Sequence, residues 1–222
     1  YDIKGNYGGT FAGPDLGSNS NPVAQQKRTI NNRNSSWNIV GNAYAEVDLL
    51  KNLTARTSIG ANINNPYSQR FNFTEYDNKQ GNSSPNSYSE GASYNNTITW
   101  TNTLKYSQQF GKHNMQILLG SESIKSTGRS VGGGSQKFFS TAFDYLILGN
   151  GTSGVTNYST AYVNSLYSIF SRLDYSFQDK YLVGATIRRD GSSKFGSEKR
   201  FGIFPSVSLG CRLSIEDFMK SS

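Results

Sequence analysis

The sequence predicts an all-β protein, a section of a transmembrane antiparallel β-barrel with long extracellular loops. Three observations carry this prediction. Apolar and polar residues alternate in seven separate runs, which is the pattern of strands with two different faces. The runs are roughly 8–17 residues long, and most exceed ten, closer to the about 9–11 residues of a membrane-spanning strand than to the about 5–6 of a soluble one. Tight turns alternate with long polar stretches, as in outer-membrane barrels.

The seven runs share one pattern, in which every second side chain is apolar and its neighbours are polar or charged. They cover residues 37–49, 53–63, 94–110, 115–122, 163–177, 181–188 and 201–213. In the first run Ile39 and Val47 alternate with Glu46 and Asp48. Successive side chains of a strand point to opposite faces of the sheet. We therefore expect one face to contact hydrocarbon and the other to border water.

The connections between the runs are alternately short and long. Tight turns are expected at 51–53, 111–112 and 178–180, and long polar stretches at 64–91, 125–161 and, shorter, 191–200. Periplasmic turns of such barrels are short and extracellular loops are long. The sequence thus predicts part of a single barrel domain, with mostly extracellular loop in 1–36, up-and-down strands in 37–214 and a periplasmic turn in 215–222. Open sheet edges are too costly in a bilayer, so we expect a piece of a longer barrel.

Turn length fixes which residues face each other across a hairpin. A three-residue turn at 178–180 pairs Phe177 with Tyr181 on the apolar face. The same turn length at 51–53 places Asp48 opposite Arg56 on the polar face. The charged residues expected to line the lumen are Asp48, Arg56, Arg172, Asp174 and Arg188. Charge introduced at Ile169 or Val183 should disrupt assembly, and the same change at Ser168 should be tolerated.

Composition excludes several classes of function. The single Cys and the single His cannot build a disulfide or a zinc site, and no segment reaches the about 20 apolar residues of a spanning helix. The net charge of +7 comes from scattered residues without a basic patch, which argues against nucleic acid. The carboxylates Glu46 and Asp48 have no His nearby in the sequence, and Gly132–Ser135 lacks the lysine of a phosphate loop and suggests a flexible loop. We expect no enzyme, no metal and no cofactor.

Aromatic residues in the two long polar stretches are the candidates for contact with a substrate or a protein partner. With one arginine among them, they are Tyr67, Arg70, Phe71, Phe73, Tyr76, Phe138, Phe139 and Tyr145. Aromatic rings beside amides and arginine suit stacking on sugars or packing on a partner protein. The alternative is that these rings pack the loops against each other.

Two segments near the C-terminal end carry distinctive motifs: residues 171–196, with Arg-Asp-Gly-Ser-Ser at 189–193, and residues 200–210, with Phe-Pro-Ser at 204–206. Residues 21–24, 41–48, 111–114 and 118–120 add weaker matches in the same order. Together these segments resemble one family, the SusC/RagA-type TonB-dependent outer-membrane transporters. One departure is Cys211, which stands where an aromatic residue is common.

The resemblance implies a 22-stranded barrel, with its plug domain and barrel ends absent from this chain. It implies active import of oligosaccharides or peptides across the cell outer membrane, with a SusD-like surface lipoprotein as a lid and energy from the TonB complex through regions absent here. Outer-membrane lipid would surround the barrel, and the long loops would meet the substrate or the lid. Two alternatives stay open: a glycan-binding surface β-sandwich, and a passive porin or siderophore-type receptor.

Overall fold

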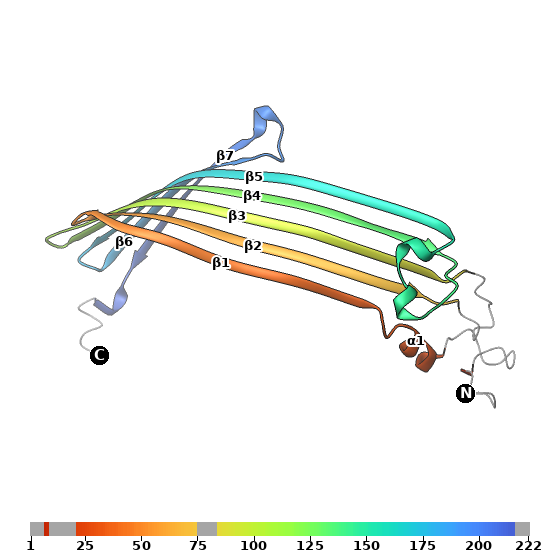
Figure 1. Cartoon of the computed structure of the whole chain (residues 1–222). Coiled ribbons are helices and arrows are strands. Elements are labelled where there is room, and N and C mark those ends of the chain that lie inside the picture. Colours follow the sequence, from red (N-terminus) through yellow and green to blue (C-terminus); the bar gives the residue numbers. More distant parts are fainter. Residues whose placement is uncertain (1–6, 9–20, 75–83, 216–222) are drawn as a thin grey trace. The chain divides into compact units, whose positions relative to one another are not determined.

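The computed structural model describes residues 7–8, 21–74 and 84–215. Within them the chain forms one short α-helix, α1 (Pro22–Arg28), seven strands and four single-turn 3-10 helices, η3 (Phe143–Tyr145), η4 (Leu148–Asn150), η5 (Ser197–Lys199) and η6 (Leu213–Ile215). The strands are β1 (Arg33–Leu50), β2 (Leu53–Asn72), β3 (Ser87–Phe110), β4 (His113–Gln136), β5 (Ser153–Phe177), β6 (Tyr181–Ser192) and β7 (Phe201–Cys211). They form a single sheet in chain order, each strand hydrogen-bonded to the next (Figure 1). The predicted all-β, up-and-down arrangement is confirmed.

The residues group into two compact units. The turn-side unit comprises Ile39–Ile63, Asn96–Thr127 and Tyr162–Ser222, and the loop-side unit comprises Tyr1–Asn38, Asn64–Asn95 and Gly128–Ala161. Within the turn-side unit the strand segments run from 11 residues, in β7, to 16 residues, in β5. A membrane-spanning strand needs about 9–11 residues. The turn-side unit by itself therefore has strands long enough to cross a bilayer.

The hairpin turns of the turn-side unit are as tight as predicted. Gly111 has φ 62° in the β3–β4 turn, and Gln178 and Asp179 both have φ 54° in the β5–β6 turn. Positive φ in tight hairpin turns matches the twist of the strands, and glycine reaches it without strain. Phe177 pairs with Tyr181 across the β5–β6 turn, which confirms the predicted register.

The strands extend further than the alternation predicts. β2 continues to Asn72, β3 begins at Ser87, β4 continues to Gln136 and β5 begins at Ser153, so the stretches outside strands shrink to 73–86 and 137–152. Residues 132–135, expected as flexible loop, belong to β4. These outer segments are rich in Asn, Ser and Gly on both faces and so carry no apolar period. Backbone pairing with a neighbouring strand makes them strands. In the predicted N-terminal loop, α1 is capped by Asn21, whose side chain accepts from the backbone amides of Val23 and Ala24.

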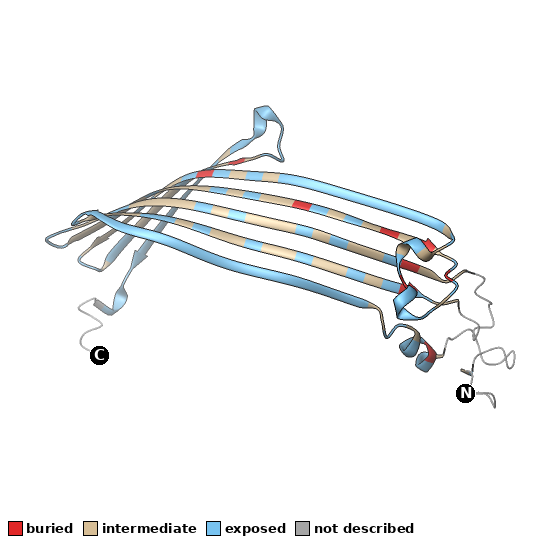
Figure 2. Ribbon diagram, in the orientation of Figure 1, coloured by how far each residue is buried: buried red, intermediate tan, exposed pale blue. Residues whose placement is uncertain are grey.

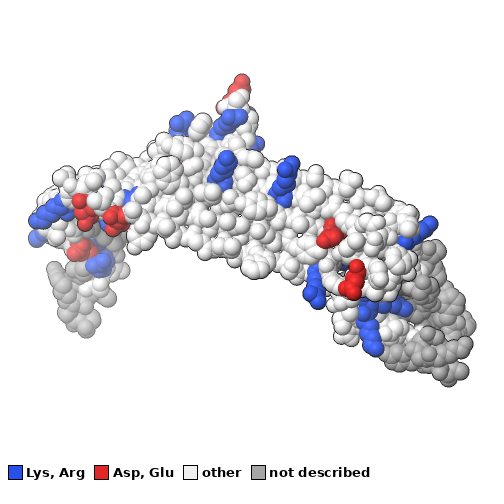
Figure 3. Space-filling view, in the orientation of Figure 1, with Lys and Arg blue, Asp and Glu red and all other residues white. Residues whose placement is uncertain are grey.

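The two faces of the sheet in the turn-side unit differ in chemistry. We call the side that carries Ile169, Leu173 and Ile187 the apolar face, and the side that carries Ser168 and Arg188 the polar face. Thr97 and Ser126 join β3 to β4 on the polar face through a side-chain hydrogen bond of 3.0 Å. Charged side chains are sparse along the strands in the view of Figure 3.

The apolar face is not enclosed in a core. Ile39, Ile59, Ile98 and Ile187 are between 39% and 59% exposed, and few residues along the strands are buried (Figure 2). A β-sandwich would bury these side chains between two sheets, whereas the described residues form one sheet. The sandwich alternative is therefore rejected for the described part of the chain. Separately, none of the helices in that part is long and apolar enough to cross a membrane.

Candidate functional site

Arg188 on β6 is the centre of a charged network on the polar face. Its guanidinium donates to Glu122 on β4 (2.9 Å), to Asp190 (2.6 Å) and to the hydroxyl of Ser168 on β5 (2.8 Å). It also lies over the ring of Phe170, 5.4 Å from the centroid. Charge-assisted bonds of this kind are about twice as strong as neutral ones. One cation thus links three neighbouring strands.

Ser168 departs from the expectation that it would tolerate a charge. Its side chain is 0% exposed and accepts the hydrogen bond from Arg188. A long charged side chain at this position would collide with the guanidinium of Arg188 and displace it. The polar face is therefore a packed surface around Ser168, and a tolerant control must be sought elsewhere on that face.

A second ion pair on β5 is more open to solvent. Arg172 donates to Asp174 through Nε (2.7 Å) and Nη2 (2.9 Å). The side chains are 56% and 37% exposed. Exposed pairs contribute little to stability. These two predicted lumen residues are therefore available to a ligand or a protein segment on the polar face.

Arg56 and Asp48 have partners other than those predicted. Arg56 forms an ion pair with Glu46 at 3.7 Å, and Asp48 accepts a hydrogen bond of 2.7 Å from Thr54. Both partners are shifted by two residues from the predicted register. The predicted pairing of Asp48 with Arg56 is therefore wrong, although the shift by two keeps the interacting side chains on a shared face.

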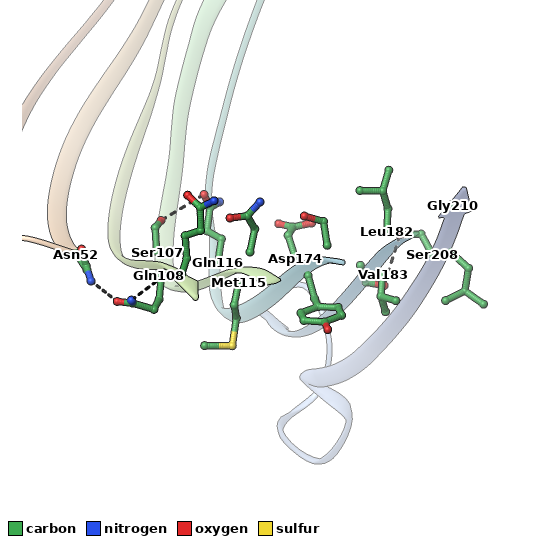
Figure 4. Close-up of a pocket in the computed structure, with 16 residues that line it drawn as sticks. Asn52, Ser107, Gln108, Met115, Gln116, Asp174, Leu182, Val183, Ser208 and Gly210 are labelled. Atoms are coloured by element: carbon green, nitrogen blue, oxygen red, sulfur yellow. Dashed lines mark hydrogen bonds between the residues drawn. The ribbon is translucent and has the colours of Figure 1, made fainter. Parts of the chain in front are cut away.

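A hollow of about 780 Å³ lies beside the hairpin turns of the turn-side unit. In Figure 4, Ser107, Gln116 and Asp174 project to one side of the sheet and Met115 to the other. The Ser107 hydroxyl donates to Gln116 over 3.5 Å. These groups can donate to and accept from a polar ligand or a backbone segment. The arrangement is therefore suited to binding through hydrogen bonds.

Four aromatic and aliphatic side chains form the small core of the loop-side unit. They are Phe71, Tyr88, Phe138 and Leu146, and each is at most 8% exposed. Phe138 makes edge-to-face contacts with Phe71 (5.8 Å) and Tyr88 (6.0 Å). The expectation that Phe71 and Phe138 offer ring faces to a ligand is therefore wrong, because packing between strand and loop uses those faces. Phe73 packs partly buried against the same cluster.

Two of the remaining predicted contact residues, Phe139 and Tyr145, form an exposed pair. Phe139 is 75% exposed and Tyr145 48% exposed, and their rings touch with centroids 5.3 Å apart. Arg70 is exposed on β2, and Tyr76 lies outside the described residues. The exposed pair in the 137–152 segment keeps the chemistry of a sugar- or protein-contacting surface.

Tyr67 is engaged with a partner that the sequence did not indicate. Its hydroxyl donates to Glu90 on β3 at 2.5 Å. This bond, reinforced by burial, raises the pKa of Tyr67 above its ordinary value. The two residues are 23 positions apart, and no local pattern links them.

Glycines allow close packing next to that pair. A Cβ at Gly132 would lie 2.5 Å from the ring of Tyr158 and 2.7 Å from the carbonyl oxygen of Glu90. Gly132, together with Leu148 and Val155, lines a hollow of about 520 Å³ in the loop-side unit. A side chain at Gly132 would push against backbone, which is costly in a packed site.

Metal chemistry finds no support in the described residues, where no group of three or more His, Cys, Asp or Glu side chains could hold a metal ion. His113 instead contacts aromatic residues at the hairpin turns. It lies 2.7 Å from the Tyr175 hydroxyl and stacks on Phe110 at 5.2 Å. An aromatic cluster at the end of a strand is typical of the interfacial girdle of a membrane barrel.

Comparison of the sequence with known proteins gives relatives of one kind. The chain is 29% identical over 224 residues to TonB-dependent receptor P3 of Formosa agariphila, which covers 100% of this chain and 22% of the relative. It is 29% identical over 227 residues to TonB-dependent receptor SusC of Bacteroides thetaiotaomicron, covering 95% of this chain and 21% of the relative. The chain thus spans about a fifth of the length of these relatives. No protein-family model matches it.

Solved structures of the same kind share the fold. The RagAB peptide importer in the 'open-open' state matches with a TM-score of 0.83 and 22% identity, over 99% of this chain and 24% of that chain. The RagAB peptide transporter matches with a TM-score of 0.77 and 24% identity, over 89% and 22% respectively. The relatives found by sequence are thus TonB-dependent receptors, and the chain shares the fold of a section of the RagAB transporter structures.

Proposed function

We propose that the chain forms part of the barrel wall of an active outer-membrane importer of oligosaccharides or peptides, driven by TonB and covered by a SusD-like lipoprotein. One observation carries the proposal: the turn-side unit combines an exposed apolar face with a polar face held together by the Arg188 network. Such a sheet is stable only where hydrocarbon covers one side and water or protein the other. The similarity to TonB-dependent receptors supports the step from barrel to importer.

The loop-side unit supports a role in contact outside the membrane. Its segment 137–152 is fixed at both ends, since Asn86 bonds to the backbone of Phe138 (2.8 and 3.0 Å) and the backbone amide of Thr152 donates to the carbonyl of Gln136 (2.9 Å). Phe139 and Tyr145 project from this fixed segment as exposed rings. A rigid scaffold that presents exposed aromatic rings suits a binding surface. We assign the contact with the substrate or the lid to this segment.

The test uses the full-length protein in its own host. A strain that lacks the gene should lose growth on an oligosaccharide or a peptide mixture as the sole nutrient, and the intact gene should restore it. Uptake should stop when the proton gradient that energises TonB is collapsed. Uptake that continues without the gradient would indicate a passive porin, and loss of iron uptake alone would indicate a siderophore-type receptor.

Double replacement of Phe139 and Tyr145 by Ala tests the surface assigned to contact. We expect weaker uptake at low substrate concentration, with normal amounts of assembled protein. Replacement of Phe195 by Ala is the matched control, because this ring is 60% exposed in the segment between β6 and β7, in the turn-side unit. Equal effects of the two changes would contradict the assignment.

A further inference from the structure

Arg188 and Arg189 are neighbours on β6 with opposite environments. Arg188 has three polar partners on the polar face. Arg189 points to the apolar face, is exposed, and makes no hydrogen bond or ion pair with any residue that the structure describes. Its contact is the ring of Phe201 on β7, 4.1 Å from the centroid. An arginine on a membrane-facing surface without a carboxylate partner requires an explanation.

The strand register places Arg189 within an apolar row. Ile169 on β5 and Ile203 on β7 are its direct cross-strand neighbours. In the next row, Gly191 lies between Tyr167 and Phe201. A Cβ at Gly191 would lie 2.4 Å from a ring carbon of Phe201. The glycine therefore makes room for the Phe201 ring, which stacks on the guanidinium.

An apolar groove of about 390 Å³ begins beside this arginine. Its aliphatic lining consists of Leu119, Ile169, Ile187 and Ile203, each 50–63% exposed. Arg189 is the only charged residue in the lining. A groove of this composition fits a hydrocarbon chain, with the cation at one edge available to an anionic group.

The position along β6 places Arg189 near the edge of the membrane. Eight residues separate it from Tyr181 at the hairpin end, which is about 27 Å along a strand and about 20 Å along the membrane normal at a tilt near 40°. The apolar band of such barrels is about 25 Å tall. Arg189 therefore lies near the edge opposite the tight turns, on the side of the 193–200 connection.

We propose that Arg189, Phe201 and the adjoining groove bind a phosphorylated lipid of the outer leaflet, with its phosphate on the guanidinium and an acyl chain in the groove. The proposal rests on the proposed function, because it needs the turn-side unit to lie in the outer membrane. A planar guanidinium offers paired donors to phosphate oxygens, and Phe201 holds it in place. The lipid supplies the anion that the described protein residues do not.

Retention of lipid by the full-length purified protein tests the site. The probes are bisphosphorylated lipid A, the same lipid after removal of its phosphates, and inorganic phosphate, and native mass spectrometry counts the lipid retained. Arg189→Gln should reduce retention of the phosphorylated lipid about tenfold, as expected for losing a bond to a charged group. Lys112→Ala, an exposed cation at the β3–β4 turn, is the matched control and should retain the lipid.

Several outcomes would overturn the proposal. Equal retention by the wild type and Arg189→Gln, or equal retention of lipid A with and without phosphate, removes the role of the arginine. Displacement of the lipid by millimolar inorganic phosphate would indicate a simple anion site. Arg189→Lys keeps the charge and should retain more of the phosphorylated lipid than Arg189→Gln, though less than the wild type. If the Gln variant does not assemble, the comparison of Arg189→Lys with the wild type replaces it, and equal retention by these two removes the role of the guanidinium. Nutrient uptake is measured in parallel: its absence in the wild type would refute the proposed importer and leave the lipid result standing.

Discussion

An arginine placed in the middle of the apolar face should strongly impair the barrel. Leu173, Ala185 and Val207 form one row across β5, β6 and β7. On β6 this row lies four residues from Tyr181 and four from Arg189, so it falls near the midplane of the apolar band. An arginine facing lipid at the midplane costs about 2–4 kcal/mol. Leu173→Arg should therefore reduce the ratio of assembled to unassembled protein about 30- to 1,000-fold.

Positions at a different depth in the membrane or on the other face of the sheet provide the controls for this experiment. Ile169 lies in the row of Arg189, near the edge of the apolar band. This position replaces the disruption expected from the sequence for a charge at Ile169 with a cost of only about 0–1 kcal/mol for Ile169→Arg, as near an interface. Ser206→Arg replaces an exposed residue that faces Thr186 on the polar side and should have little effect. The assay is the fraction of full-length protein that stays folded in detergent without boiling. Equal losses for Leu173→Arg and Ser206→Arg would refute the assignment of faces, and a larger loss at Ile169 than at Leu173 would refute the assignment of depth.

Three further changes probe the interior contacts. Arg188→Ala should lower the free energy of unfolding by about 2 kcal/mol, between the values for exposed and buried pairs, because it leaves the carboxylates of Glu122 and Asp190 without their cation. Arg172→Ala should lower it far less. Urea unfolding of the protein in vesicles measures both changes. Because the pKa of Tyr67 is raised in the folded state, the stabilisation by its phenol is complete below about pH 10 and is lost as the pH rises above that value. The protection of backbone amides from hydrogen exchange should therefore fall at alkaline pH, and Tyr67→Phe should make this fall smaller. The same pH profile in both proteins would contradict the argument. Gly132→Ala should cost about 1–3 kcal/mol of local stability by overpacking, seen as faster exchange in β3 and β4, while Gly149→Ala, with open space around it, should not.

The sequence predicted most of the structure of the turn-side unit. Alternation along residues 163–177 and 181–188 predicted both strands, and the turn length predicted the pairing of Phe177 with Tyr181. These features are local, because strand period and turn geometry depend on residues close in the chain. The same reasoning failed at Asp48 and Arg56, whose side-chain partners are shifted by two residues from the predicted register.

The loop-side unit shows where local patterns end. Gly132–Ser135 indicated a flexible loop, and neighbouring strands turn it into part of β4. Phe71 and Phe138 had the composition of a binding surface, and their burial became visible only once β2 and the 137–152 segment were brought together. A polar strand with water on both sides carries no periodic signal, so sequence alone could not separate it from a loop.

By itself, the sequence determined the strand class, the hairpin order and the two chemically different faces, because each follows from side-chain alternation and short turns. Only the tertiary structure decided which charges meet. Glu122 and Arg188 are 66 residues apart and join through β5, and Arg188 and Arg189 differ only by the face on which each lies. Which of two adjacent arginines finds a carboxylate depends on strands brought alongside from elsewhere in the chain, and no local pattern encodes that pairing.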